Sequence, residues 1–281
     1  MKKLILLVLL VGIAGIAGIV RSHSKSGGRF EWPVKVNAQK PSSGDVREEI
    51  RKTFELSPGA RVDVSGINGF VKIETSNTRT ADIYIERFGE SAEALSRRKI
   101  VIESTGDRLT IRSEKAEESG LMSRIFGSNP REQVTLKLPR AIALSTKGVN
   151  GAVKVGEIDG SVHVSGINGR VEIAQAAGSA DFSGINGSVS VALRDLGKDG
   201  MEISGINGNI ELRLADGINA DLKAHGMNGS VTSDLPSVVI DKSSRGNYTA
   251  RIGAGGNSIS ASGINGNIRL IRMAGVDDRI G

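Results

Sequence analysis

The sequence contains no cysteine, three histidines and only 3% aromatic residues. The absence of cysteine excludes disulfide bonds and a lipid-modified N-terminal cysteine, and it deprives a zinc site of its usual ligands. We therefore expect no metal and no cofactor. The fold must depend on hydrogen bonding and on the burial of aliphatic side chains, because cross-links are absent and large aromatic rings are scarce.

Basic residues are in slight excess, but not in the most regular part of the chain. The formal net charge is +6; residues 1–60 hold 10 basic and 5 acidic residues, whereas residues 147–281 hold 13 basic and 14 acidic residues. A nucleic-acid-binding protein needs a basic face on its folded part. We therefore expect no nucleic-acid partner.

Glycine is abundant, with 37 residues, and many of these belong to one repeated motif. The pentapeptide Ser-Gly-Ile-Asn-Gly occurs at Ser65–Gly69, Ser165–Gly169, Ser183–Gly187, Ser204–Gly208 and Ser262–Gly266. Degenerate copies are Lys147–Gly151 and His225–Gly229, and the stretch at 244–247 keeps only Asn247 in register. The segments that start at these points are 147–164, 165–182, 183–203, 204–224, 225–243, 244–261 and 262–281. A period of 18–21 residues is the mark of a repeat architecture.

Each repeat has the pattern of two short strands joined by two corners. Val171 and Ile173 alternate with Arg170 and Glu172, which is the period of a half-buried strand. The inward pairs of the first strand are predicted to be Val153/Val155, Val171/Ile173, Val189/Val191, Ile210/Leu212, Ala250/Ile252 and Ile268/Leu270. Those of the second strand are Val162/Val164, Ala180/Phe182, Met201/Ile203, Leu222/Ala224 and Ile259/Ala261. Asn-Gly tolerates positive φ, so the chain can turn sharply at the motif.

Two topologies fit these repeats. Asn-Gly between alternating strands is a hairpin signal and would give an antiparallel meander. Near-identical corners favour stacking of like on like every ~4.7–4.9 Å, which would align the asparagines in a hydrogen-bonded ladder and the isoleucines in an apolar spine. We therefore predict an all-β fold, a β-solenoid similar to a parallel β-helix, built from 18–21-residue two-strand rungs with Gly-Ile-Asn-Gly corners. The predicted ladder and spine comprise Asn68, Asn150, Asn168, Asn186, Asn207, Asn228, Asn247 and Asn265, with Ile67, Ile167, Ile185, Ile206 and Ile264.

The N-terminal segment, residues 1–20, is typical of an export signal. Met1-Lys2-Lys3 precedes seventeen uncharged residues, Leu4–Val20. This is the pattern of a secretory signal peptide, but seventeen residues also reach the lower limit for a membrane anchor. Either interpretation predicts an exported protein, in the periplasm, at the cell surface or anchored in the membrane. Residues 21–52 are polar and basic and are predicted to be a linker.

Residues 53–146 are predicted to be an N-terminal β part with insertions, ahead of regular repeats over 147–281. The expected strands are Thr53–Leu56, Arg61–Ser65, Phe70–Glu74, Asp82–Arg87, Ile100–Ser104, Arg108–Ser113, Gln133–Leu138 and Ile142–Thr146. Gly89–Arg98 is a candidate helix, and Glu114–Pro130 a loop. The first motif lies 82 residues before the next, which equals about four rungs, so this half is predicted to be either the same solenoid with insertions or its capping end. Asp277 and Asp278 are expected to blunt the last edge.

The repeated Gly-Ile-Asn-Gly followed by alternating aliphatic residues resembles the bacterial putative-adhesin families of β-strand repeats, which include the head-GIN domain. The stretches FELSPGARVDVSGINGFVKIE (Phe54–Glu74) and LKLPRAIALSTKGVNGAVKV (Leu136–Val155) show the same likeness, which covers about residues 50–275. The resemblance implies a β-strand repeat fold and an adhesin-like role at the cell envelope. It brings no catalytic residues with it.

The sequence contains few residues in patterns that indicate catalysis or ligand binding. His23, His163 and His225 are scattered over the linker, an outward strand position and a corner. The Asp-Gly pairs at Asp159, Asp199 and Asp216 resemble fragments of calcium-binding repeats, but they lack the nonapeptide spacing and are interpreted as turns. The outward columns after each motif hold Ser, Thr, Asn, Arg and Glu without stacked carboxylates.

The sequence therefore predicts a non-enzymatic, exported β-solenoid of the cell envelope that binds a surface or acts as a scaffold. Its expected partners are an unknown surface ligand, either a glycan or an envelope protein, and the membrane if the N-terminal segment is not cleaved. One alternative is a self-assembling envelope protein whose exposed solenoid ends stack. Another is a polysaccharide-active enzyme of the parallel β-helix kind, which would need Asp, Lys and Arg side chains converging on one face.

Overall fold

A computed structural model describes residues 45–116 and 129–273. The predicted signal or anchor, the linker up to residue 44, most of the predicted loop Glu114–Pro130, and Asp277 and Asp278 lie outside the described residues. Within the described part, no helix is long and apolar enough to cross a membrane.

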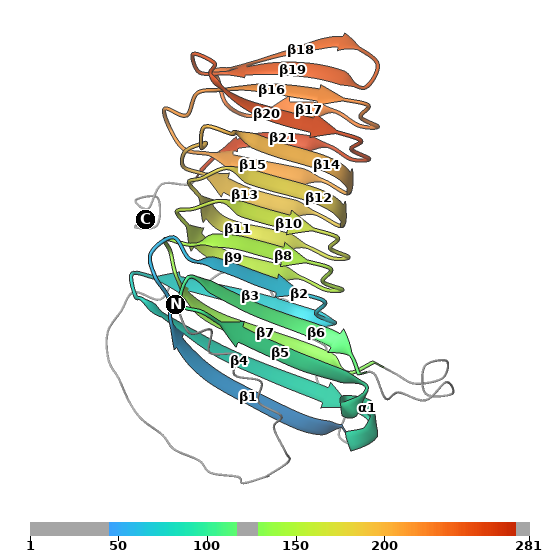
Figure 1. Cartoon of the computed structure of the whole chain (residues 1–281). Coiled ribbons are helices and arrows are strands. Elements are labelled where there is room, and N and C mark those ends of the chain that lie inside the picture. Colours follow the sequence, from blue (N-terminus) through green and yellow to red (C-terminus); the bar gives the residue numbers. More distant parts are fainter. Residues whose placement is uncertain (1–44, 117–128, 274–281) are drawn as a thin grey trace, which may run out of the picture.

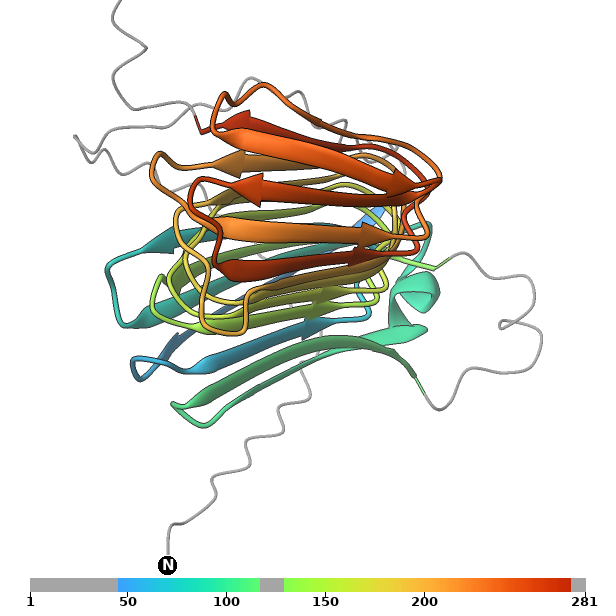
Figure 2. The same ribbon diagram turned by 90° about the horizontal axis from the view of Figure 1, so that it is seen from above.

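The fold is all-β, with two large mixed sheets that lie face to face (Figures 1 and 2). The first sheet contains, in spatial order, β1 (Val46–Glu55), β4 (Thr80–Gly89), β7 (Arg131–Pro139), β3 (Gly69–Ser76), β9 (Val153–Ile158), β11 (Val171–Ala176), β13 (Val189–Leu193), β15 (Ile210–Leu214), β21 (Ile268–Arg272) and β17 (Val231–Ser233). The second contains β18 (Val238–Ser244), β19 (Asn247–Ile252), β16 (Ala220–His225), β20 (Asn257–Ser262), β14 (Met201–Asn207), β12 (Ala180–Asn186), β10 (Val162–Ser165), β8 (Ala143–Lys147), β2 (Arg61–Ser65), β6 (Arg108–Lys115) and β5 (Arg98–Ser104). A short helix, α1 (Ala92–Ser96), precedes β5.

From β8 to β16 the chain alternates between the two sheets, and each strand up to β15 pairs in parallel with the strand one repeat earlier. Val162, for example, lies opposite Leu144 on one side and Ala180 on the other. The same in-register pairing joins β9, β11, β13 and β15. The antiparallel meander is therefore the wrong topology for these repeats, and like residues stack on like residues.

The core lies between the two sheets and follows the predicted alternation. Every predicted inward pair is buried, and Val171, Ile173 and Phe182 are completely inaccessible to solvent. The residues between them face outward and are partly exposed. The period of two in the sequence therefore identified the buried face of each repeat correctly.

The first motif stacks directly on the second, although 82 residues separate them. Strand β2 pairs in parallel with β8, and β3 with β9. The intervening strands β4, β5, β6 and β7 lie on the other side of β2 and β3 (Figure 1). The gap of about four rungs is therefore not four rungs inserted between the motifs but an end structure built beside the first one.

The N-terminal edge begins earlier than predicted. Residues 46–52, which lie in the predicted linker, belong to β1, which pairs antiparallel with β4 over its whole length. Their alternation was hard to recognise because the inward positions include Glu48 and Lys52 beside Ile50. The predicted helix Gly89–Arg98 shortens to α1, capped by the Ser91 side chain.

The order of the last repeats in space differs from their order in the chain. Strand β21 lies between β15 and β17, and β20 lies between β14 and β16. The last motif therefore occupies a place between the two motifs at 204–208 and 225–229, as the red strands among orange ones in Figure 1 show.

Residues 244–261 do not form a rung, which corrects the predicted repeat. Strands β18 and β19 form an antiparallel hairpin around Arg245 and Gly246, and Gly246 has φ 76°. The hairpin reverses the chain, so that β19 pairs antiparallel with β16 in the second sheet. Ala250 and Ile252 are buried as predicted, but in the sheet opposite the one expected.

A short glycine-rich loop after β19 returns the chain to its inserted position. The backbone N–H of Ala254 donates to the Asn219 side chain at 2.7 Å, and that of Gly256 donates to the Asp221 carboxylate at 3.0 Å. Both acceptors lie at the start of β16 or just before it. The loop that follows the hairpin is therefore held against the start of β16, next to the place that the last repeat occupies.

We predict that deleting residues 257–281 releases the segment 216–252 from the array. In the described chain, β16 pairs only with β19 and β20, and β17 only with β21. Without β20 and β21, this segment has no partner strand in the rest of the array, so protease cleavage within it should rise by roughly tenfold or more. Limited proteolysis with mass spectrometry measures this, with deletion of residues 274–281 alone as the control. Unchanged protection would mean that the 225–229 motif restacks directly on the 204–208 motif.

Candidate functional site

Seven asparagine side chains form one hydrogen-bonded ladder along the edge where the chain passes from the second sheet to the first. The Nδ2 group of each donates to the Oδ1 atom of the previous asparagine at 3.0–3.2 Å. In spatial order the ladder is Asn68, Asn150, Asn168, Asn186, Asn207, Asn265 and Asn228. All donors point the same way, and Asn68 ends the series by donating to the Pro130 carbonyl at 2.9 Å.

The ladder therefore brings together seven of the eight predicted asparagines and leaves out Asn247. The Oδ1 atom of Asn247 accepts a hydrogen bond from the Gly226 N–H at 3.3 Å, and its Nδ2 donates to Ser244 at 2.7 Å. The cause is the hairpin turn at Gly246, which points this asparagine at the neighbouring backbone instead of at Asn228.

The residues around each asparagine explain why the motif is so uniform. The isoleucines Ile67, Ile167, Ile185, Ile206 and Ile264 are each 1% exposed and plug the core at the corner. Gly184 has φ 59°, in the left-handed region. A Cβ atom on Gly187 would lie 2.1 Å from the Gly169 carbonyl oxygen, so the rungs could not approach each other with any other residue there.

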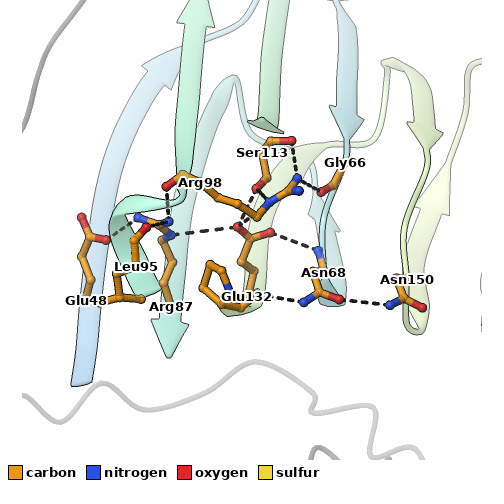
Figure 3. A network of polar contacts seen from close by, with 10 residues as sticks. Glu48, Gly66, Asn68, Arg87, Leu95, Arg98, Ser113, Glu132 and Asn150 are labelled. Atoms are coloured by element: carbon orange, nitrogen blue, oxygen red, sulfur yellow. Dashed lines mark hydrogen bonds and ion pairs between the residues drawn. The ribbon is translucent and has the colours of Figure 1, made fainter. Parts of the chain in front are cut away.

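A buried carboxylate occupies the position where the ladder meets the N-terminal end strands. Glu132 in β7 lies opposite Gly69 and is completely inaccessible to solvent. Its Oε2 atom accepts the Asn68 backbone N–H at 3.1 Å, and its Oε1 atom accepts the Ser113 hydroxyl at 2.5 Å. The carboxylate thus replaces the next rung as the partner of the first motif (Figure 3).

Two arginines flank this carboxylate, and Figure 3 shows them on either side of it. The Nε atoms of Arg87 and Arg98 lie 4.0 and 3.9 Å from the Glu132 carboxylate. Arg87 also donates to Glu48 at 2.5 Å, and Arg98 donates to the Gly66 carbonyl at 2.7 Å. Two cations and two carboxylates balance, so the cluster has no net charge and none of these charges is buried alone.

The residues of this cluster are not among those predicted from the sequence, although the sequence contains a signal for it. Glu132 continues the inward alternation of Val134, Leu136 and Leu138, and Arg87 continues that of Ala81, Ile83 and Ile85. Ser113 extends the inward series of Leu109 and Ile111 in the same way. A polar residue at the end of an inward alternation, in several strands at once, indicates a buried polar network.

The outward face of the first sheet holds a central column of polar side chains. In spatial order it comprises Lys72, Lys154, Glu172, Ser190, Glu211, Arg269 and Thr232. Partial burial lowers the pKa of Lys154; Glu172, 4.0 Å away, acts in the opposite direction, and Lys72 adds to the lowering. Glu211 stacks on Arg269 because of the inserted last repeat.

The outward face of the second sheet has a corresponding column, in which Ser145, His163, Asp181 and Glu202 occupy adjacent strands. His163 Nδ1 lies 2.8 Å from the Asp181 carboxylate, and both side chains are more than 40% exposed. A serine nucleophile needs its base within hydrogen-bond reach. The described chain shows no bond between Ser145 and His163, and it holds no group of three His, Asp or Glu side chains placed to bind a metal.

Comparison with known proteins finds no matching family model and no matching curated protein. Among solved structures, the chain is similar to a putative cell adhesion protein from Clostridium sporogenes, with 15% identity over 81% of this chain and 100% of the other and a TM-score of 0.40. It is similar to a putative adhesin from Bacteroides fragilis, with 14% identity over 82% and 98% of the chains and a TM-score of 0.31. A putative lipid binding protein from Parabacteroides distasonis gives 13% identity, coverage of 80% and 97%, and a TM-score of 0.28.

We predict that Ile185→Asp unfolds the array. Ile185 is 1% exposed, and an aspartate there would bury an unpaired charge, which destabilises by about 4 kcal/mol or more. Urea denaturation followed by circular dichroism measures the free energy of unfolding. Ser188→Asp, at an outward position three residues later, is the control and should change that free energy by less than about 0.5 kcal/mol. Equal effects would mean that the two faces are assigned wrongly.

We predict that Glu132→Ala lowers the free energy of unfolding by about 3–5 kcal/mol, because it leaves Arg87 and Arg98 without their buried counter-charge. The same denaturation experiment measures the change. Glu211→Ala is the matched control: this side chain is 40% exposed and 3.9 Å from Arg213, so its loss should cost less than about 1 kcal/mol. A Glu132 variant no less stable than the control would show that the cluster does not support the N-terminal end.

Proposed function

We propose that this protein is an exported, non-enzymatic β-solenoid of the cell envelope that serves as a surface-binding or scaffolding module, in the manner of an adhesin. The observation that supports this best is the form of its outer faces. Both sheets expose polar side chains in straight, in-register columns along the array. Such columns offer an extended binding surface in place of one enclosed reaction site.

The solenoid interpretation is supported by the parallel register and by the asparagine ladder. Each turn of the chain contributes one strand to each sheet, and equivalent corners bond to each other. We assign the Gly-Ile-Asn-Gly corners the role of holding the turns in register. The buried isoleucine anchors each corner to the core, and the asparagine side chain hydrogen-bonds to the equivalent asparagine of the adjacent turn.

The expected ligand is a polymer or an extended surface, either a glycan or another envelope protein. Adjacent parallel strands repeat every ~4.8 Å, so the polar groups along each column recur at a regular spacing. Serine, arginine and glutamate side chains in such a row can hydrogen-bond successive units of a polymer. A partner with its own repeat can therefore be held at many weak contacts at once.

Export follows from the N-terminal pattern, a basic start and an uncharged run at Leu4–Val20. A cleaved signal would release the array into the periplasm or to the cell surface. A retained segment would anchor it in the membrane, with residues 21–44 between the anchor and β1.

We predict that the protein occurs in the envelope fraction of the producing cell. Cell fractionation with mass determination of the mature N-terminus measures this. A chain that starts near Gly18 and lies outside the inner membrane supports the surface-bound form, and an intact Met1 in the inner membrane supports the anchored form. Recovery of the intact chain in the cytoplasm would contradict the proposal.

The enzymatic alternative depends on Asp181 and Glu202, two carboxylates side by side next to His163. Assays of the purified chain with acidic and neutral polysaccharides distinguish it from the proposed role. We expect no cleavage. Cleavage that is abolished by Glu202→Gln and kept in Glu211→Gln would replace the binding module with a polysaccharide-active enzyme.

A further inference from the structure

The two ends of the described array differ in how their outer strands are protected. At the N-terminal end, β1 turns Glu48 and Lys52 toward the inner side, where Glu48 bonds to Arg87. Inward charges of this kind discourage pairing with another strand. At the other end, the first sheet stops at β17, which has only three residues, and the second stops at β18. Figure 1 shows β18 as the outermost strand.

Strand β18 is an open edge whose first half is apolar. It begins with Val238, Val239 and Ile240, and Val239 is 70% exposed; the one other exposed large hydrophobic residue in the described ranges 45–116 and 129–273, Val46, is 39% exposed. Val238 and Ile240 are partly buried against the core. The strand contains no proline, and among the residues that the structure describes it pairs on one side only, with β19. These are the properties of an edge that accepts another strand.

The register of the hairpin shows which backbone groups of β18 are free. The Ser237 carbonyl accepts the Gly253 N–H at 3.1 Å, and Val239 lies opposite Arg251. In an antiparallel pair the bonded residues alternate, so the odd-numbered residues of β18 face β19. The N–H and C=O groups of Ile240 therefore face outward along the open edge, as do those of Lys242.

We propose that β18 pairs antiparallel with β18 of a second copy of this chain, about a two-fold axis at Ile240. Each Ile240 then donates its N–H to the Ile240 carbonyl of the other copy, and Lys242 donates to the Val238 carbonyl. The second sheets of the two copies join into one continuous sheet. This goes beyond the proposed surface-binding role, because it uses the end of the array and not its faces.

The charges of the strand select this register. Opposed residues must share a face, so the axis falls on a residue of β18. An axis at Val238 places Ile240 opposite Pro236, outside the strand, and an axis at Ser243 or Ser244 places strand residues opposite the hairpin turn. Val239, Ile240, Asp241 and Lys242 remain. An axis at Asp241 or at Lys242 places that charge opposite its own copy, which is destabilising. An axis at Val239 places Lys242 opposite Pro236, outside the strand. Only the axis at Ile240 opposes isoleucine with isoleucine and covers Val239 and Val238 with the other copy's Asp241 and Lys242.

Pairing of this kind closes at two copies. The same strand from each molecule forms the contact, so the interface is isologous and leaves the N-terminal ends, including β1 with its inward charges, pointing outward. We therefore expect a discrete dimer and not an open stack of many copies.

The absence of cysteine allows a direct test with single cysteines in the full chain. Opposed residues of a bonded antiparallel pair have Cα atoms about 5.5 Å apart, within reach of a disulfide. Ile240→Cys should therefore give a covalent dimer under mild oxidation. Val239→Cys, whose two copies would be diagonal neighbours about 7–8 Å apart, is the matched control. We expect roughly tenfold less dimer from it.

Light scattering of the unmodified chain over a range of concentrations provides the second readout, with a mass of two copies expected. Ile240→Pro removes an N–H that points away from β19, and the side chain that it shortens is only partly buried, so it should give a folded monomer. A strict monomer at high concentration would overturn the proposal. So would equal cross-linking of Ile240→Cys and Val239→Cys, cross-linking through Asp241→Cys instead, or a dimer that survives Ile240→Pro.

Discussion

The structure depends on the in-register stacking of repeats that cannot fold alone. A single repeat buries only four or five aliphatic side chains, and this burial is too small to offset the conformational entropy that its backbone loses on ordering. Neighbouring repeats must supply the difference through strand pairing on both sides. The asparagine ladder and the buried isoleucines matter because they enforce the register in which this pairing and this burial occur together.

An array of stacked repeats leaves the outermost strands of each sheet without a partner on one side, and the two ends of this array are closed in different ways. The N-terminal end replaces a missing rung with Glu132, which accepts the Asn68 N–H and is neutralised by Arg87 and Arg98. Antiparallel strands β1, β4 and β5 then close both sheets. The C-terminal end is closed by the β18–β19 hairpin, with the last repeat inserted behind it. One end is thus sealed by buried charge and the other retains an apolar edge.

The corner residues and the outward residues of each repeat are under different constraints. This explains why the residue types vary on the outer faces but not at the corners. The motif requires glycine where the backbones of neighbouring repeats approach closely, as at Gly187, and isoleucine where the side chain is buried, as at Ile185. The outward residues between them contact solvent, so Lys154, Glu172 and Ser190 can occupy equivalent positions without affecting the stack. The outward side chains of such an array can therefore differ from repeat to repeat while the stacking stays the same.

The sequence by itself determined the all-β fold class, the inward and outward faces, and the residues of the corners. Each of these features depends on residues that are close together in the sequence. The period of two indicates which side chains are buried, and the repeated Asn-Gly indicates where the chain turns. The tertiary structure alone decided which repeats are neighbours. Motifs that are nearly identical can stack in many orders, and a longer connection costs little extra entropy, so neither the contact between the first two motifs nor the inserted last repeat is encoded locally. The same holds for the Glu132 cluster, whose members lie on separate strands and meet only once the end strands are paired.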